Sequence, residues 1–322
     1  MDFTEVDSFM RHVLLLLFIV ALAIPARAQT PARTIAVTID DLPYVRMSDA
    51  PYLPSARTAT AKILSTLKKH KVPAIGFVNE AQLDYGNDRE ARIGLLRDWV
   101  NSGMMLGNHT YSHPDFNQLT VAQFEEQIVK GEVVTRQLMQ SRRPYQLYFR
   151  HPMTHTGDTL EKKEAIEKFL AARGYKITPH TIENSDFIFN VGYAQAVQKG
   201  DTELAKRLRD SYLELTITAT EFAEKISPQL FNREIPQILL IHSNDLNADC
   251  LDELLQKFEE RGYKFVTLDK VMSDPAYETK DTYVNKYGPT WFFRWSKSKG
   301  LSLDFSGDQD PPKWVMDIYN SR

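Results

Sequence analysis

The chain has 322 residues, of which 43% are hydrophobic, 11% aromatic and 25% charged. This balance is typical of a folded globular protein and excludes a disordered or fibrous chain. The formal net charge of -3 provides no broad attraction to nucleic acid or anionic lipid, so we expect no nucleic-acid partner and look for a local site. The single cysteine, Cys250, excludes an internal disulfide framework.

The N-terminal segment has the pattern of a cleaved export signal. Residues 13–24 form an apolar run of signal-peptide length, and residues 26–28 supply a small-x-small cleavage pattern. The run is shorter than the roughly 20 residues that span a bilayer, so a signal peptide over residues 1–28 is favoured over a membrane anchor. Met10, followed by two basic residues, is an alternative translation start. We therefore expect a mature chain that begins at Gln29, is periplasmic or secreted, and has no stable membrane insertion.

Apolar runs rich in β-formers alternate with amphipathic segments along the chain, which predicts βαβ units and a parallel sheet. The predicted strands are residues 34–39, 74–78, 104–106, 147–149 and 237–241. Gly174 and Gly262 each follow a helical pattern and precede a Tyr-Lys pair. Both positions are therefore predicted to end a helix in the left-handed conformation, with a further strand following.

One domain is predicted over residues 29–274. Residues 192–234 are mostly helical in composition and long for a crossover, and no Pro/Gly/Ser-rich linker separates them from their neighbours. We interpret them as a helical excursion from that domain. Residues 275–322 form an aromatic-rich C-terminal extension. We expect it to pack on the domain, because aromatic side chains mostly bury area; lining a sugar groove is the alternative.

Candidate metal ligands follow two of the predicted strands. His109 and His113 are four residues apart, so on a helical turn both rings face one side and can share a metal ion. An isolated pair of this kind more often has polar or helix-capping roles. Asp40 and Asp41, however, also end a strand, at the rim where parallel α/β folds build their sites. Adjacent carboxylates converge only where the strand breaks, and Pro43 follows closely.

Three further ionisable residues lie near the ends of predicted elements. Arg150 follows the strand at 147–149, His242 follows the strand at 237–241, and Asp186 lies between them in the sequence. Singly, they are typical of a surface ion pair, a hydrogen-bonded core histidine and a turn former. Jointly with the aspartate and histidine pairs, they indicate a hydrolytic metal site.

In chain order, five segments resemble the motifs of the polysaccharide deacetylases, the NodB-homology family also called carbohydrate esterase family four. The segments are residues 38–41, 109–113, 150–152, 184–187 and 240–242. The resemblance extends from about residue 34 to 270 and implies an α/β fold, a distorted (β/α)7 barrel with its site at the C-terminal face.

The resemblance also implies a role for each polar residue. Asp41, His109 and His113 would bind one divalent metal ion, zinc or else Co²⁺, Mn²⁺ or Ni²⁺. Asp40 would be the catalytic base and Arg150 would orient it.

On the substrate side, the resemblance implies that His242 is the catalytic acid and that Asp186 tunes it. Met153 would offer its backbone amide to the oxyanion, and Leu240 would line the pocket for the acetyl methyl group. Phe187 stands where the family usually has tryptophan, and Met153 where it usually has an aromatic residue or glycine. These two departures leave the identity of the substrate open.

The resemblance implies a hydrolase that removes acetyl groups from an acetylated carbohydrate. The export signal favours N-deacetylation of an amino-sugar polymer, such as peptidoglycan or a chitin-like glycan. An O-acetyl esterase acting on acetylated hemicellulose would use the same residues. A catalytically silent carbohydrate-binding protein is the third hypothesis, ranked last because both Asp40 and His242 are present.

Overall fold

The computed structural model describes residues 33–47 and 49–321. The predicted signal peptide and the predicted mature N-terminus at Gln29 lie outside these residues. Among the helices of this described part, none combines the length and the apolar character needed to cross a membrane.

Strands and helices alternate through most of the described chain. The strands are β1 Thr34–Leu42, β2 Ile75–Val78, β3 Met105–Asn108, β4 Leu147–Phe149, β5 Tyr175–Ile177, β6 Gln237–His242 and β7 Lys264–Phe265. The α-helices are α2 Tyr52–Lys69, α3 Arg89–Asn101, α4 Val121–Lys130, α5 Val133–Met139, α6 Leu160–Ala172, α7 Asp186–Lys199, α8 Thr202–Phe231, α9 Asp245–Glu260, α10 Leu268–Met272, α11 Trp291–Ser298 and α12 Lys313–Asn320. Short 3₁₀ turns lie at Glu80–Leu83, Phe116–Gln118, Gln140–Arg142, Pro152–Thr154 and Pro275–Glu278.

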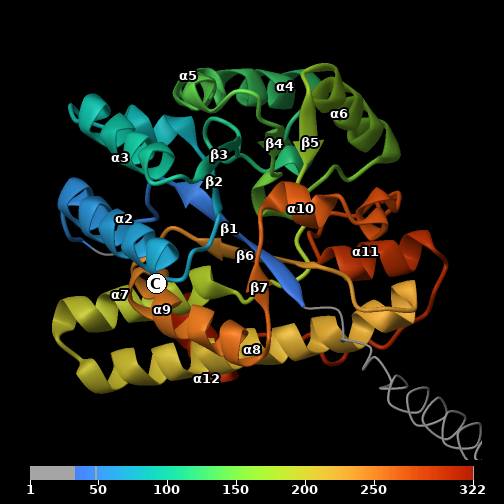
Figure 1. The fold of residues 1–322 in the computed structure, drawn as a ribbon. Helices are drawn as coiled ribbons and strands as arrows, with labels where there is room; N and C mark the ends of the chain where they lie inside the picture. Colours follow the sequence, from blue (N-terminus) through green and yellow to red (C-terminus); the bar gives the residue numbers. More distant parts are fainter. Residues whose placement is uncertain (1–32, 48, 322) are drawn as a thin grey trace, which may run out of the picture. The chain divides into compact units, whose positions relative to one another are not determined.

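The seven strands form one parallel sheet in the order β5-β4-β3-β2-β1-β6, with β7 paired to β1. The chain after β5 turns back to β6, where Ile182 forms a parallel bridge with Leu239. This link connects the two ends of the sheet. Helices surround the sheet (Figure 1). The predicted α/β fold, a distorted (β/α)7 barrel, is confirmed, with a parallel sheet curled into part of a barrel.

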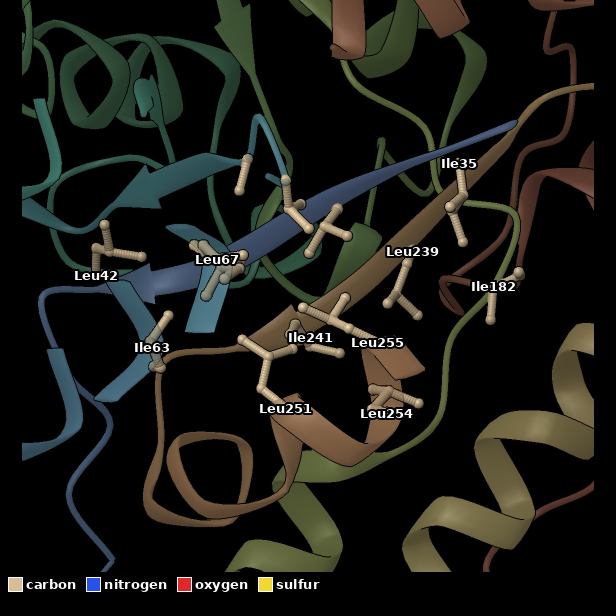
Figure 2. Packing of buried hydrophobic residues seen from close by; sticks show 14 of the residues in the cluster. Ile35, Leu42, Ile63, Leu67, Ile182, Leu239, Ile241, Leu251, Leu254 and Leu255 are labelled. Atoms are coloured by element: carbon tan, nitrogen blue, oxygen red, sulfur yellow. The ribbon is translucent and has the colours of Figure 1, made fainter. Parts of the chain in front are cut away.

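The alternation of β1 separates two apolar layers. Ile35, Val37 and Ile39 are completely or almost completely buried and belong to the core that includes α2 and α9 (Figure 2). Ala36 belongs to a second cluster, inside the curled sheet. Because side chains alternate along a strand, Asp40 shares the inner face of β1 with Ala36. Burial of each large aliphatic side chain contributes about 1.5–3 kcal/mol, which holds this strand firmly beneath the site.

The two predicted glycine turns are confirmed. Gly174 follows α6 with φ 81°, and Gly262 follows α9 with φ 83°. A residue with a Cβ atom is disfavoured in this left-handed region, so glycine ends each helix and lets the chain enter β5 or β7 directly.

The helical excursion consists of α7 and α8, two helices that pack against each other and against α9. The C-terminal extension contains α11 and α12, for which the sequence showed no clear period. Trp291, Phe292 and Trp295 of α11 are buried in the same core as β1. Residues of α8 and α11 are thus built into the hydrophobic core.

Candidate metal and catalytic site

The two aspartates at the end of β1 face one site because the strand is irregular there. The register of β1 against β2 shifts between Ile39 and Leu42, and Asp41 has φ 62°. A non-glycine residue in this region stores strain, of order 1–3 kcal/mol. The irregularity turns Asp41 out of the strand alternation, so its carboxylate lies beside that of Asp40.

Asp41 lies between the two histidines of the second motif. Its Oδ1 atom is 3.5 Å from Nε2 of His109 and 3.5 Å from Nε2 of His113. The three side chains offer ligand atoms that all lie within 4.8 Å of one another. Oδ1 of Asp41 is buried and has no hydrogen-bond partner within the described structure, although burying an unpaired anionic oxygen is costly. A cation would satisfy this oxygen, and one carboxylate with two imidazoles suits zinc or a similar divalent ion.

The segment from His109 to His113 is not the helical turn expected from the spacing. Thr110 has φ 68° and His113 has φ 56°, so two left-handed residues bend the chain sharply. The bend brings the histidine rings to 4.9 Å between centroids. The two rings converge as predicted, but through a loop that the spacing alone does not indicate.

His109 presents an unprotonated nitrogen to this cluster. Its Nδ1–H group donates to the backbone carbonyl of Arg150 over 2.8 Å, which leaves Nε2 as the acceptor nitrogen beside Asp41. Burial lowers the pKa of His109 to about 4. The ring is therefore neutral near pH 7, as metal binding requires.

Asp40 is 2% exposed and lies directly beside the three candidate ligands. Its Oδ2 atom is 3.7 Å from Nε2 of His109 and 3.7 Å from Nη1 of Arg150. Nη2 of Arg150 donates to Oγ1 of Thr38 over 2.9 Å and to the carbonyl of Pro179 over 3.3 Å. Arg150 is thus fixed by neutral partners, with its positive charge near the Asp40 carboxylate.

His242 and Asp186 form a buried ion pair. Nδ1–H of His242 donates to Oδ1 of Asp186 over 2.6 Å, and the backbone amide of His242 donates to Oδ2 over 2.9 Å. Burial alone would lower the pKa of His242, but the charge and hydrogen bond of Asp186, with smaller contributions from Asp41 and Asp40, raise it to about 10. His242 therefore carries a proton at neutral pH and can act as an acid.

Residues that were not predicted hold Asp186 in place. Nδ2 of Asn244 donates to its Oδ2 atom over 2.8 Å, and Nδ2 of Asn247 donates to the same oxygen. Asn247 in turn accepts a 2.6 Å hydrogen bond from the hydroxyl of Tyr212 in α8. The polar run after the strand-end His242 was a usable signal for the two asparagines. Tyr212 gave no signal, because an aromatic residue on a helix face is typical of a core.

Phe187, Met153 and Leu240 are the three residues for which the resemblance implies contact with the substrate. Phe187 is 36% exposed, and its ring centroid is 5.7 Å from that of His242 and 6.3 Å from that of Tyr319 in α12. Met153 is 49% exposed, whereas Leu240 is buried in β6. Phe187 and Met153 are accessible to a large ligand, whereas Leu240 is not.

Beside Asp41 and His113 there is a pocket of about 330 Å³, a volume typical of small-molecule sites. Its aromatic walls, which the sequence interpretation missed, come from Tyr44, Tyr52, Tyr85 and Tyr111. Three of these rings are fixed through their hydroxyl groups, Tyr44 by Asp245 at 2.7 Å, Tyr52 by Gln82 at 3.0 Å and Tyr111 by Asp84 at 2.9 Å. Tyr85 is 61% exposed at the rim. Preformed aromatic walls suit the apolar face of a sugar ring.

The sequence was compared with known proteins. The family described as polysaccharide deacetylase matches residues 27–172, a range that contains the first three motifs but neither Asp186 nor His242. A peptidoglycan-N-acetylglucosamine deacetylase of Bacillus cereus is 24% identical over 240 residues, which cover 73% of this chain and 66% of the relative. A chitin deacetylase of Colletotrichum lindemuthianum is 24% identical over 258 residues, covering 77% of this chain and 87% of the relative.

Among solved structures, a peptidoglycan N-acetylglucosamine deacetylase matches with a TM-score of 0.47 and 23% identity, covering 74% of this chain and 87% of that one. The range that matches the family in sequence includes Asp41, His109 and His113, whose ligand atoms the fold brings close together. Residues 27–172 of the chain thus match the polysaccharide deacetylase family, and relatives of the chain are peptidoglycan and chitin deacetylases.

Proposed function

We propose that this protein is an exported N-deacetylase of an amino-sugar polymer and that it requires one divalent metal ion, most suitably zinc. The observation that supports this most strongly is the cluster of Asp41, His109 and His113, whose ligand atoms lie within 4.8 Å of one another. A base and an acid stand beside this cluster, as acetyl transfer to water requires.

Asp41, His109 and His113 would hold the ion, with Co²⁺, Mn²⁺ and Ni²⁺ as alternatives to zinc for the same donor set. When bound, the ion polarises the acetyl carbonyl group and activates water. The loss of the negative charge of Asp41 would weaken the site most directly, because this oxygen has no other partner in the described structure.

Asp40 would take the proton from the attacking water. Its Oδ1 atom is buried without a hydrogen-bond partner among the described residues, so it is free to accept one from a water molecule. Arg150, 3.7 Å from Oδ2, would orient the carboxylate toward the water.

His242 would give its proton to the leaving group. An amine is a poor leaving group unless it is protonated, so amide hydrolysis depends on a general acid more strongly than ester hydrolysis does. The pKa of His242, raised to about 10 beside Asp186, keeps that proton available at neutral pH. This pair therefore favours N-deacetylation over the alternative O-acetyl esterase.

The substrate would be an acetylated amino-sugar chain. The pocket walled by four tyrosines offers room for a sugar ring next to the one that carries the acetyl group. The names of the two relatives, which refer to peptidoglycan N-acetylglucosamine and to chitin, support the same class of polymer.

A polymer of this class lies outside the cytoplasm, in agreement with the export signal expected over residues 1–28. N-terminal sequencing of the protein recovered from the periplasm or the medium should give Gln29 as the first residue. Recovery of protein that begins at Met1 or Met10 would contradict cleavage.

Release of acetate from a panel of N- and O-acetylated glycans tests the function. The metal-free protein should be inactive, and zinc should restore acetate release from N-acetylated oligomers. Faster release from acetylated xylan would support the esterase instead. Binding of glycan without release of acetate, at any metal content, would support the silent binding protein.

A further inference from the structure

The turn that carries Met153 has an unusual backbone. Met153 has φ 52° and Thr154 has φ 53°, so two consecutive residues with a Cβ atom occupy the left-handed region. Such residues persist only where the surroundings impose the conformation. The turn itself contributes hydrogen bonds from the amide of Thr154 to the carbonyl of His151 and from the amide of His155 to that of Pro152, each at 3.0 Å.

The C-terminal extension contacts this turn directly at Gly288. Oγ1 of Thr154 donates to the carbonyl of Gly288 over 2.5 Å. The approach is so close that a Cβ atom at position 288 would overlap both Oγ1 of Thr154 and the carbonyl oxygen of Met153. Only glycine lets the extension lie against the turn at this distance.

A second contact comes from Arg294 in α11, which is 1% exposed. Nη2 of Arg294 donates to the carbonyl of Thr154 over 2.6 Å, and Nη1 donates to Oγ1 of Thr156 over 2.9 Å. A buried guanidinium with several acceptors has a fixed orientation. It therefore fixes the backbone that follows Met153.

The extension is itself anchored on both sides of these contacts. Oδ2 of Asp281 accepts from Nζ of Lys163 in α6 over 2.8 Å and lies 3.3 Å from Nη1 of Arg294. The amide of Trp291 donates to the carbonyl of His180 over 3.0 Å, and the Trp291 side chain is buried in the core. Residues 281–294 can thus transmit the rigidity of the core to the turn.

We propose that residues 281–294 form a strap that positions the backbone amide of Met153 for the reaction. Met153 is the second residue of the Pro152–Thr154 turn, and the first amides of a helical turn have no partner within it. This amide is therefore open to donate a hydrogen bond, and the resemblance to the family implies that its acceptor is the acetyl oxygen as negative charge develops there. The inference rests on the proposed function, because the amide is useful only if an acetyl group reacts beside it.

Gly288→Ala tests the strap. Position 288 does not have a left-handed φ, so alanine is compatible with the backbone there and acts by displacing the turn. We expect kcat for N-acetylated oligomers to fall by about 10²-fold, near the effect of losing one oxyanion donor. KM and zinc content should stay within about twofold of wild type, because the metal ligands and the sugar pocket lie elsewhere.

Binding of a tetrahedral phosphonate analogue of the acetyl group gives a readout that a structural role alone would not change. Its affinity should fall by the same factor as kcat/KM in Gly288→Ala, while affinity for a substrate oligomer stays constant. The matched control is Gly94→Ala in α3, where nothing lies within 4 Å of the added Cβ atom. Equal kcat and equal analogue affinity in Gly288→Ala and Gly94→Ala would overturn the strap.

A second pair of variants decides the matter if Gly288→Ala does not fold. Thr154→Val removes the hydroxyl that bonds Gly288 and keeps the shape of the side chain, whereas Thr154→Ser keeps the hydroxyl. We expect kcat to fall about tenfold in Thr154→Val and much less in Thr154→Ser, with zinc content unchanged. Equal kcat in the two variants contradicts the strap. A zinc-loaded wild-type protein without acetate release contradicts the proposed function itself.

Discussion

The hydroxyl of Tyr212, in α8, donates a 2.6 Å hydrogen bond to Oδ1 of Asn247, in α9. This bond fixes the Asn247 amide so that Nδ2 faces Oδ2 of Asp186 and the carbonyl of His242, the latter at 2.9 Å. Tyr212 is fully buried. The helical excursion is thereby connected to the ion pair of Asp186 and His242 through one side chain.

Tyr212→Phe should weaken the ion pair of Asp186 and His242, although both residues of the pair are retained. The variant leaves Oδ1 of Asn247 buried and without its donor, which costs about 1–3 kcal/mol in the free energy of unfolding. We expect kcat to fall several-fold and the alkaline limb of the pH–rate profile to move to lower pH. Tyr193→Phe, which loses a 2.8 Å hydrogen bond to Asp249, is the control: a similar loss of stability should leave kcat unchanged. Parallel pH profiles for both variants would contradict this connection.

Asp186→Asn should change how stability depends on pH. The folded-state pKa of His242 is about 10, above the value of about 6.5 for an unfolded histidine. A raised pKa contributes stability that is fully present below the unfolded pKa and is lost as the pH rises through the folded one. Between pH 6.5 and 10, the stability difference between wild type and Asp186→Asn should therefore shrink. Urea unfolding across this range measures it, and a constant difference would contradict the assignment.

His113→Ala should lose most bound metal while the fold persists. The variant removes one of the three proposed ligands, whereas the core of β1, α2 and α9 does not depend on an ion. Elemental analysis of the purified protein measures the metal, and circular dichroism confirms the fold. Metal content equal to wild type would remove His113 from the ligand set.

Tyr85→Ala should weaken binding of long substrates only. The Tyr85 ring lies at the rim of the pocket beside Asp41 and His113, a pocket that neither Phe187 nor His242 lines. KM for a chitin or peptidoglycan oligomer should rise about 2- to 13-fold, as expected for a lost aromatic contact of about 0.5–1.5 kcal/mol. Hydrolysis of a small acetyl ester should be unaffected, and Tyr85→Phe should behave as wild type. A tenfold loss of activity on the small ester would contradict a binding role.

The parallel sheet and the carboxylate pair could be predicted because they depend on local patterns. The apolar run of β1 is set by alternation, and Asp40 and Asp41 follow it directly. The strand ends of a parallel sheet meet at one edge, so the segments bearing His109 and His242 could be expected there as well.

The other features of the site depend on contacts between segments that are distant in the sequence. No local periodicity indicates such contacts. Thr110 and His113 have left-handed φ angles where the spacing indicated a helical turn. Tyr212 reaches Asn247 from a helix whose pattern resembles that of any core helix. Gly288 contacts Thr154 across more than a hundred residues, in an extension without a clear period.

The division of labour between Asp40 and Asp41 is the central claim, and the rate of acetate release with and without excess zinc tests it most directly. Asp40→Asn keeps the metal ligands but cannot accept the proton of water, so the rate should fall by roughly 10²–10⁴ and added zinc should not restore it. Asp41→Asn replaces an anionic ligand by a neutral amide, so activity should be lost through weak metal binding and should return in part with excess zinc. Rescue of Asp40→Asn by zinc, with none for Asp41→Asn, would reverse the two roles; full activity of both variants would contradict the deacetylase site.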